Sequence, residues 1–255
     1  MTKQTKKISI FVLTMMNIAL VMSLRGLPLM AKEGLPMLFF LLFAAFVFLI
    51  PTALIAAELA TGWPGGGGVY RWVKEAFGPR WGFIAIWLQW VQNISWYPTI
   101  LSFVAGALAY FLYSPSLANS KLFNICIILG VFWGATLINC RGIKASSKLT
   151  TLGVILGTIF PGILIIALGF VWLFAGKPLV FLQNPTSFLP DFSNFKSIAF
   201  LAGVVLLFAG IEVTAVHAGE VKNPSRDYPR SIFLATLIIL GIFSLGSLSI
   251  GAVLP

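Results

Sequence analysis

Long apolar runs recur along this chain of 255 residues, and each is long enough to cross a lipid bilayer as a helix. Crossing the hydrocarbon core takes about 20 apolar residues per helix. Short segments of alternating polarity, which a membrane β-barrel requires, are absent from the sequence. The pattern predicts an all-α, polytopic membrane protein with about seven spans. We place them at residues 8–30, 35–60, 81–113, 122–139, 149–175, 197–218 and 231–255.

The composition leaves little room for a soluble domain. Hydrophobic residues make up 59% of the chain and charged residues only 9%. A soluble domain of this composition has too little polar surface to cover its apolar side chains. The first run is too long for a signal peptide and lacks a small-residue cleavage site. We therefore expect residues 1–255 to form a single membrane domain.

The basic residues are distributed unevenly between alternate loops. Of 17 lysines and arginines, twelve lie in the amino terminus and in loops two, four and six, and four lie in the other loops. The positive-inside rule then places the amino terminus in the cytoplasm. We expect the protein to lie in the plasma (inner) membrane. The net charge of +10 is thus a topology signal and not a nucleic-acid footprint.

No catalytic constellation is visible in the sequence. The seven acidic residues are scattered, and a single histidine cannot build a metal cluster. A glycine-rich loop at 65–68 is not followed by Gly-Lys-Ser/Thr, so a tight turn before an amphipathic helix at 69–77 is the better interpretation. The sequence predicts a protein that is not an enzyme and that carries no cofactor or metal.

Two charged side chains lie inside apolar runs, where charge is costly and often functional. Arg25 lies in SLRGLPLM, ahead of Gly26 and Pro28, and Glu212 follows Ala209-Gly210. Glycine and proline weaken helices, so both spans are expected to break there. Arg25 could instead be a cation that reaches the membrane surface. Glu212 could have a structural role as well, bonding the free amides of a broken helix.

The two weak points lie in the first and sixth spans, five spans apart. Transporters built from inverted repeats of five helices break the first helix of each repeat, so that half-helix ends face a site at the midplane. Residues 8–175 would be the first repeat, and residues 197–255 the first two helices of a second. Glu212 would then open the inner half-helix, where its carboxylate suits the helix dipole.

Three further polar residues are site candidates. His217 and Glu220 share a helix face, and His217 is either an ordinary interfacial histidine or a pH-responsive group. Asn93 and Tyr97 in the third span either line a cavity or bond between helices.

With these residues in view, the chain resembles the amino acid–polyamine–organocation transporter superfamily, and within it the glutamate/γ-aminobutyrate antiporter branch. The resemblance is carried by the segments SLRGLPLMAKEG, AELATGWPGGGGVYRWVKEAFG and FAGIEVTAVHAGEVKNPSRDYPR. It implies a LeuT-like fold whose broken first and sixth helices bind the carboxylate and amino groups of an amino acid. Mapped onto this sequence, the substrate-binding residues are Ser23, Leu24, Arg25, Gly26, Phe208, Ala209, Gly210 and Glu212.

The sequence departs from that family in two respects. The family commonly breaks its first helix at a Gly-Ser-Gly type sequence, where this chain has Met22-Ser23-Leu24-Arg25-Gly26. Family members also have about twelve helices. We therefore expect a chain truncated after the seventh helix, or one to which a self-copy or a second chain supplies the rest.

Two functions of different class follow. The first is an amino acid transporter, an antiporter that works by alternating access, with an amino acid and the lipid bilayer as its partners and no nucleic acid. The alternative is a truncated, non-transporting membrane fragment or a subunit that needs a partner.

Overall fold

The computed structural model describes residues 8–63, 65–180, 188–190 and 192–253. Over these residues the secondary structure is helical apart from turns and one isolated β-bridge. Six helical segments are long and apolar enough to cross a membrane, and Ile10–Val21 forms a shorter apolar helix. The expectation of an all-α, polytopic membrane protein is confirmed.

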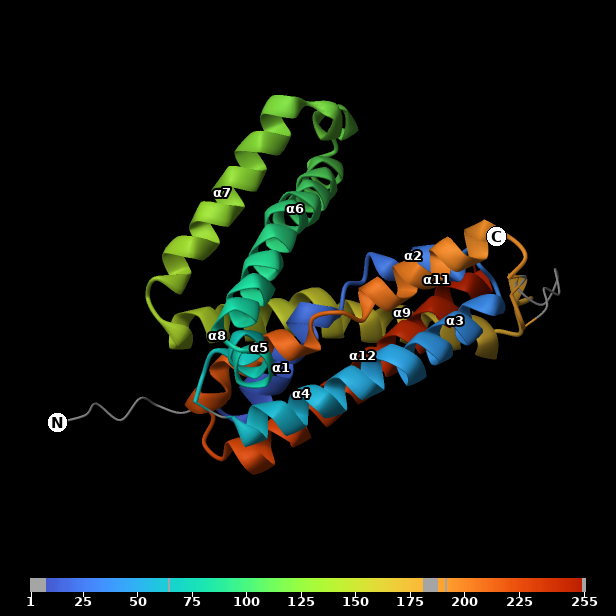
Figure 1. The fold of residues 1–255 in the computed structure, drawn as a ribbon. Helices are drawn as coiled ribbons and strands as arrows, with labels where there is room; N and C mark the ends of the chain where they lie inside the picture. The colour runs from blue at the N-terminus through green and yellow to red at the C-terminus, as the bar shows by residue number, and fades with distance from the viewer. Residues whose placement is uncertain (1–7, 64, 181–187, 191, 254–255) are drawn as a thin grey trace. The chain divides into compact units, whose positions relative to one another are not determined.

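The chain divides into two compact units, residues 8–68 with 150–253, and Val69–Leu149. Figure 1 shows their helices in chain order. The first unit contains α1 (Ile10–Val21), α2 (Gly26–Ala31), α3 (Pro36–Ala44), η1 (Ala45–Leu49), α4 (Ile50–Gly62), η3 (Ile155–Ile159), α9 (Phe160–Phe174), α11 (Phe195–Leu207), η4 (Ile211–Glu220) and α12 (Pro224–Val253). The second contains α5 (Gly68–Phe77), α6 (Pro79–Phe111), η2 (Pro115–Asn119) and α7 (Lys121–Asn139), and α8 (Ile143–Val154) runs from the second unit into the first.

Helix α12 is the centre of the first unit. It packs against α1, α2, α4 and α9. Glycines let α9 approach it closely: a Cβ atom at Gly162 would lie 2.8 Å from Cγ2 of Ile242, and one at Gly169 would collide with Ser249. On another side, the ring of Phe243 packs edge to face on Phe208, with centroids 5.6 Å apart. The core therefore sits around α12.

The second unit is a hairpin of α6 and α7, joined by the 3₁₀ turn η2 (Figure 1). Because α6 and α7 run in opposite directions, the start of α6 and the end of α7 lie at the same end of the hairpin. The predicted amphipathic helix at 69–77 is confirmed as α5.

Two of the continuous spans carry a proline just after a π-helical turn. Pro51 and Pro161 are the second residues of α4 and α9, and each follows a π-helical turn, η1 or η3. Proline has no N–H for the helix ladder, and its ring clashes with the preceding turn. A wider turn ahead of the proline relieves this conflict.

The first and sixth spans are broken, as predicted. Helix α1 ends at Val21, Met22 is extended (φ −85°, ψ 122°), and α2 begins at Gly26. Helix α11 ends at Leu207, and after Gly210 the chain continues as the 3₁₀ helix η4. The seventh span begins at Pro224 instead of residue 231. Proline is tolerated in the first turn of a helix. The charged residues after Pro224 belong to the helix although they lie outside the apolar run.

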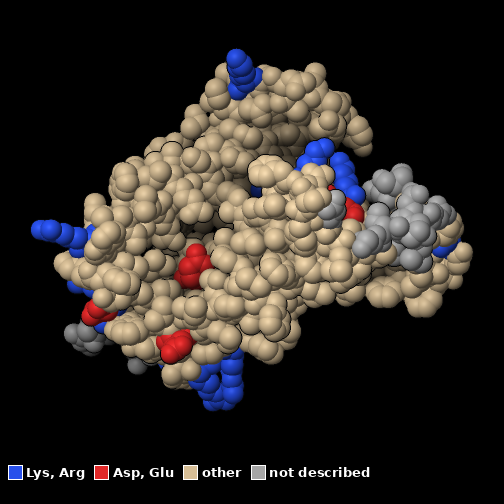
Figure 2. Space-filling model, turned by 45° about the vertical axis from the view of Figure 1, so that its right-hand side comes forward, with Lys and Arg blue, Asp and Glu red and all other residues tan. Residues whose placement is uncertain are grey.

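The surface of the molecule is mostly uncharged on the face shown in Figure 2, with lysine and arginine in separate groups. Large apolar side chains are exposed along most spans, Phe46 and Leu54 among them. Such a surface suits contact with lipid, as the apolar helices require.

Candidate functional site

The two breaks meet at Gly210. Its backbone has φ 117°, a conformation that residues with side chains rarely adopt. A Cβ atom at this position would lie 3.3 Å from the carbonyl oxygen of Leu20, in the last turn of α1. Gly210 therefore allows the main chains of the first and sixth spans to approach each other directly.

Backbone hydrogen-bonding groups are left free around this crossing. Among the described residues, no acceptor bonds the N–H groups of Ser23 and Leu24 at the first break, or of Ile211 and Glu212 at the second. The carbonyl oxygen of Leu20 likewise receives no hydrogen bond from the described part of the chain. Helix ends leave such groups free by construction. Together they offer donors for an anion and an acceptor for a cation.

Glu212 lies in the first turn of η4, half-buried, and its Oε2 accepts a hydrogen bond of 3.2 Å from the N–H of Gly210. The carboxylate therefore binds a freed amide at the amino end of the half-helix η4, as the sequence suggested. Its negative charge is favourable at this end of a helix.

A buried hydrogen-bond network lies one turn further along η4. The hydroxyl of Thr214 donates to Oδ1 of Asn17 at 2.6 Å, so Tyr228 must donate the bond of 2.8 Å between its hydroxyl and Thr214. Ser231 donates to the carbonyl of Tyr228 at 2.7 Å and accepts from Nδ2 of Asn17 at 3.5 Å. All four residues are fully buried. The network joins α1, η4 and α12.

This network was not predicted from the sequence, in which charged residues within the spans stand out most clearly. Asn17 and Tyr228 carry no charge, and Thr214 looks unremarkable in an apolar run. An uncharged amide in the middle of an apolar span was the available signal, since a buried polar group needs partners.

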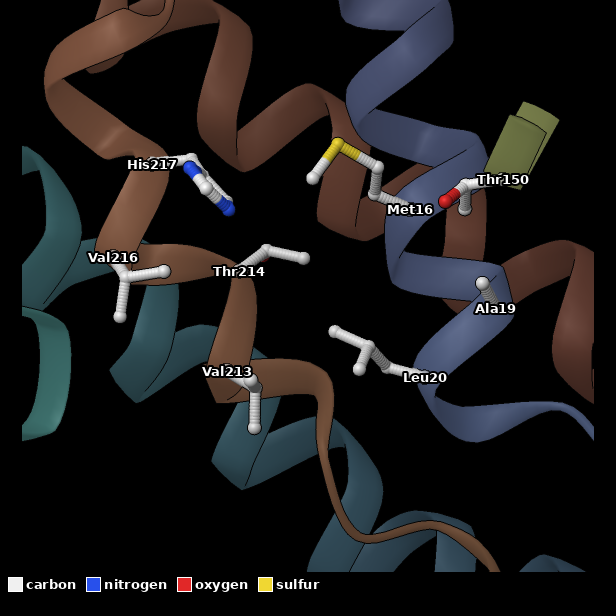
Figure 3. A pocket seen from close by; sticks show the side chains of 8 residues that line it. All are labelled: Met16, Ala19, Leu20, Thr150, Val213, Thr214, Val216 and His217. Atoms are coloured by element: carbon white, nitrogen blue, oxygen red, sulfur yellow. The ribbon is translucent and has the colours of Figure 1, made fainter. Parts of the chain in front are cut away.

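A pocket of about 210 Å³ lies between α1 and η4. Figure 3 shows the side chains of Met16, Leu20 and Thr214 pointing toward one another across it. Its volume is below the range of about 300–1,000 Å³ that holds drug-sized ligands. The pocket is lined by Met16, Ala19, Leu20, Thr150, Val213, Thr214, Val216 and His217.

The structure gives the positions of His217 and Arg25 but assigns neither residue a functional role. Nδ1 of His217 lies 3.2 Å from Oε2 of Glu220, which confirms their shared face. Arg25 is half-buried at the amino end of α2. Whether His217 responds to pH, and whether Arg25 binds substrate or reaches the membrane surface, stay predictions.

The remaining predicted residues divide between the two units. Phe208 is fully buried against Phe243, and Ala209 lies beside it within the second break. Asn93 and Tyr97 belong to α6 in the second unit, where the ring of Tyr97 packs edge to face on Phe132 at 5.9 Å. Their predicted role in lining a cavity is untested.

Multiple apolar spans, of which two break where free backbone groups gather, define a polytopic helical membrane protein. The chain belongs to the amino acid permease family, whose model matches residues 8–255.

The individual relatives are transporters. An uncharacterised transporter of Legionella pneumophila is 48% identical over this whole chain and 54% of its own length. A glutamate/γ-aminobutyrate antiporter of Lactococcus lactis is 33% identical over 98% of this chain and 50% of its own length. A probable agmatine/putrescine antiporter of Lactococcus lactis is 27% identical over 98% of this chain and 52% of its own length. The chain spans about half the length of the curated relatives it matches.

Proposed function

We propose that this chain forms the substrate-binding part of an amino acid antiporter that exchanges glutamate and γ-aminobutyrate or close analogues. The resemblance to the Lactococcus lactis antiporter supports the substrate class. The observation that carries the proposal is the crossing at Gly210, where free amides and a free carbonyl of two broken spans meet.

The substrate would bind through its backbone-like groups. Its carboxylate would accept hydrogen bonds from the N–H groups of Ser23 and Leu24, at the amino end of the segment that leads into α2. Its ammonium would meet the carbonyl of Leu20 and the carboxylate of Glu212. Arg25, Gly26, Phe208 and Ala209 would complete the wall of the site. No covalent chemistry is needed.

Alternating access would move α1 and η4 together. The network of Asn17 and Thr214 ties them to α12, and a parallel β-bridge joins Ile8 to Val221, with a bond of 2.9 Å from the N–H of Ile8 to the carbonyl of Glu220. These contacts would hold the two inner half-helices and the start of α12 together as one moving element. Its rocking would expose the substrate to one side of the membrane at a time.

The proposal includes a location and a partner. The charge asymmetry supports a cytoplasmic amino terminus. The membrane proposed is the plasma (inner) membrane. A self-copy or a second chain, or further sequence, would supply the counterpart of the relatives' length that this chain does not match. Single cysteines in place of Lys74 and Lys196 test the topology, since a membrane-impermeant reagent added outside should label only the latter.

Counterflow in liposomes tests the function. A transporter that carries these 255 residues should accumulate labelled glutamate only when unlabelled glutamate or γ-aminobutyrate is trapped inside. Liposomes loaded with agmatine or putrescine are the matched control. Exchange of agmatine and putrescine alone would show that the substrates are polyamines and not glutamate or γ-aminobutyrate. The absence of any exchange would contradict the transport function.

A further inference from the structure

One end of the second unit carries a concentration of basic side chains that transport does not use. The start of α6 and the end of α7 lie at this end, so α5 and the start of α8 lie there too (Figure 1). Glu75 is the one acid in residues 69–81 and 140–149. No ion pair involves any of these cations within the described residues. The basic end consists of Arg71, Lys74, Arg80, Arg141, Lys144 and Lys148.

Helix α5 has the form of a helix that lies at a membrane surface. Val69, Trp72 and Val73 fall on one face, and Lys74 is exposed on another. The turn at Gly78 (φ 93°) folds α5 back on α6, because a Cβ atom at Gly82 would lie 2.9 Å from Cβ of Lys74. Since α6 is a membrane span, α5 lies where that span leaves the hydrocarbon.

Exposed aromatic side chains mark the same boundary. Phe77 at the end of α5 is 73% exposed, and Trp81 in the first turn of α6 is 59% exposed. Aromatic residues, tryptophan above all, are enriched at the level of lipid headgroups.

The exposed Lys144 and Lys148 lie one turn apart on α8, so they point to the same side.

We propose that the basic end is a binding site for the phosphodiester headgroups of anionic phospholipids, such as phosphatidylglycerol, in the leaflet that faces the cytoplasm. The arginines offer paired N–H donors to phosphate oxygens, and the lysines add point charges. One acid against six cations gives the surface the charge complementary to such headgroups. The exposed aromatic rings hold it at headgroup depth.

Lipid association measured by electron spin resonance tests this site. The protein is reconstituted in phosphatidylcholine with spin-labelled phosphatidylglycerol or spin-labelled phosphatidylcholine. The association constant for phosphatidylglycerol should exceed that for phosphatidylcholine by about fivefold, the contribution of one surface cation. Replacing all six cations with glutamine should bring this ratio to about one.

The control variant removes cations from loops or helix ends elsewhere, as K121Q/K177Q/K196Q, and should keep the ratio. A variant that exchanges lysine and arginine within the basic end should keep it as well. In the unaltered protein, raising NaCl from about 0.05 M to about 0.5 M should lower the ratio, because salt screens surface charges. The salt series decides the question even where the sixfold variant fails to fold.

Three results would overturn the site: an unchanged ratio in the sixfold variant, an equal loss in the control, or a ratio insensitive to salt. If glycerol phosphate competes as well as the lipid does, the same cations bind a soluble phosphate. That result would contradict the proposed lipid site. The measurement uses symmetric membranes, so it does not depend on the orientation or the substrate of the transporter.

Discussion

The two broken spans differ in how the backbone groups at each break are bonded. At the first break, an extended Met22 separates two ordinary α-helices, and the N–H groups of Ser23 and Leu24 stay free. At the second, a left-handed Gly210 turns the chain, and Glu212 bonds its amide. At the first break, backbone N–H groups are therefore left without a partner among the described residues. At the second, a side chain bonds one of the backbone N–H groups.

This difference extends to the half-helices on one side of the breaks. The 3₁₀ helix η4 has poorer internal hydrogen-bond geometry than an α-helix. The network of Thr214 with Asn17 and Tyr228 compensates for this by fixing η4 to its neighbours. The comparison teaches that substitutions at the second break should cost more stability than equivalent ones at the first.

The largest effect is expected for Gly210→Ala. An alanine at this position must keep a backbone φ of 117°, and its Cβ atom would press on the carbonyl oxygen of Leu20. The free energy of unfolding should therefore fall by about 3 kcal/mol. Gly26→Ala, at the first break, meets only side chains of Leu207 and Phe243 at 3.2 Å and should cost about 1 kcal/mol. Thermal unfolding in one detergent compares them.

Gly203→Ala in α11 is the matched control, because a Cβ atom there has nothing within 4 Å. It should be neutral or stabilise by up to about 1 kcal/mol, as expected for alanine in a helix. Equal losses for Gly26→Ala and Gly210→Ala would show that the two breaks do not differ in this way.

The next effect is expected for Thr214→Val. Loss of the hydroxyl leaves Oδ1 of Asn17 and the hydroxyl of Tyr228 without a buried partner, at a cost of about 2 kcal/mol. Thr236→Val is the matched control on α12, since its buried hydroxyl has no partner among the described residues. That substitution should be neutral or slightly stabilising. A similar loss in both variants would contradict the role of the network.

The smallest effect on stability is expected for Glu212→Gln. The amide oxygen can still accept the hydrogen bond from Gly210, so stability should fall by less than about 1 kcal/mol. Exchange of labelled substrate should fall much further, because the charge that meets the ammonium is lost. A loss of exchange that follows stability alone would make Glu212 a purely structural residue.

The breaks could be predicted from the sequence because each is local. Gly26, Pro28 and Gly210 weaken helices wherever they occur, and an isolated carboxylate in an apolar run indicates free amides nearby. Pro28 is tolerated inside the first turn of α2, so it marks where that helix starts and is not itself the break.

The rest depended on contacts that sequence spacing does not contain. Asn17 and Thr214 are 197 residues apart, and their bond follows from how α1 and η4 pack. The π-turns before Pro51 and Pro161 keep two spans continuous that a proline rule alone would interrupt. Local chemistry located the breaks, and tertiary packing decides what holds them.

Substrate protection of a cysteine at the first break tests the central claim most directly. The transporter carries Ser23→Cys in a background without Cys126 and Cys140, and a thiol reagent is added with and without glutamate or γ-aminobutyrate. At a ligand concentration about ten times Kd, labelling should slow about tenfold, while Leu29→Cys on the exposed side of α2 should be labelled at an unchanged rate. Unchanged labelling of Ser23→Cys in a variant that still exchanges substrate would contradict a site at the crossing.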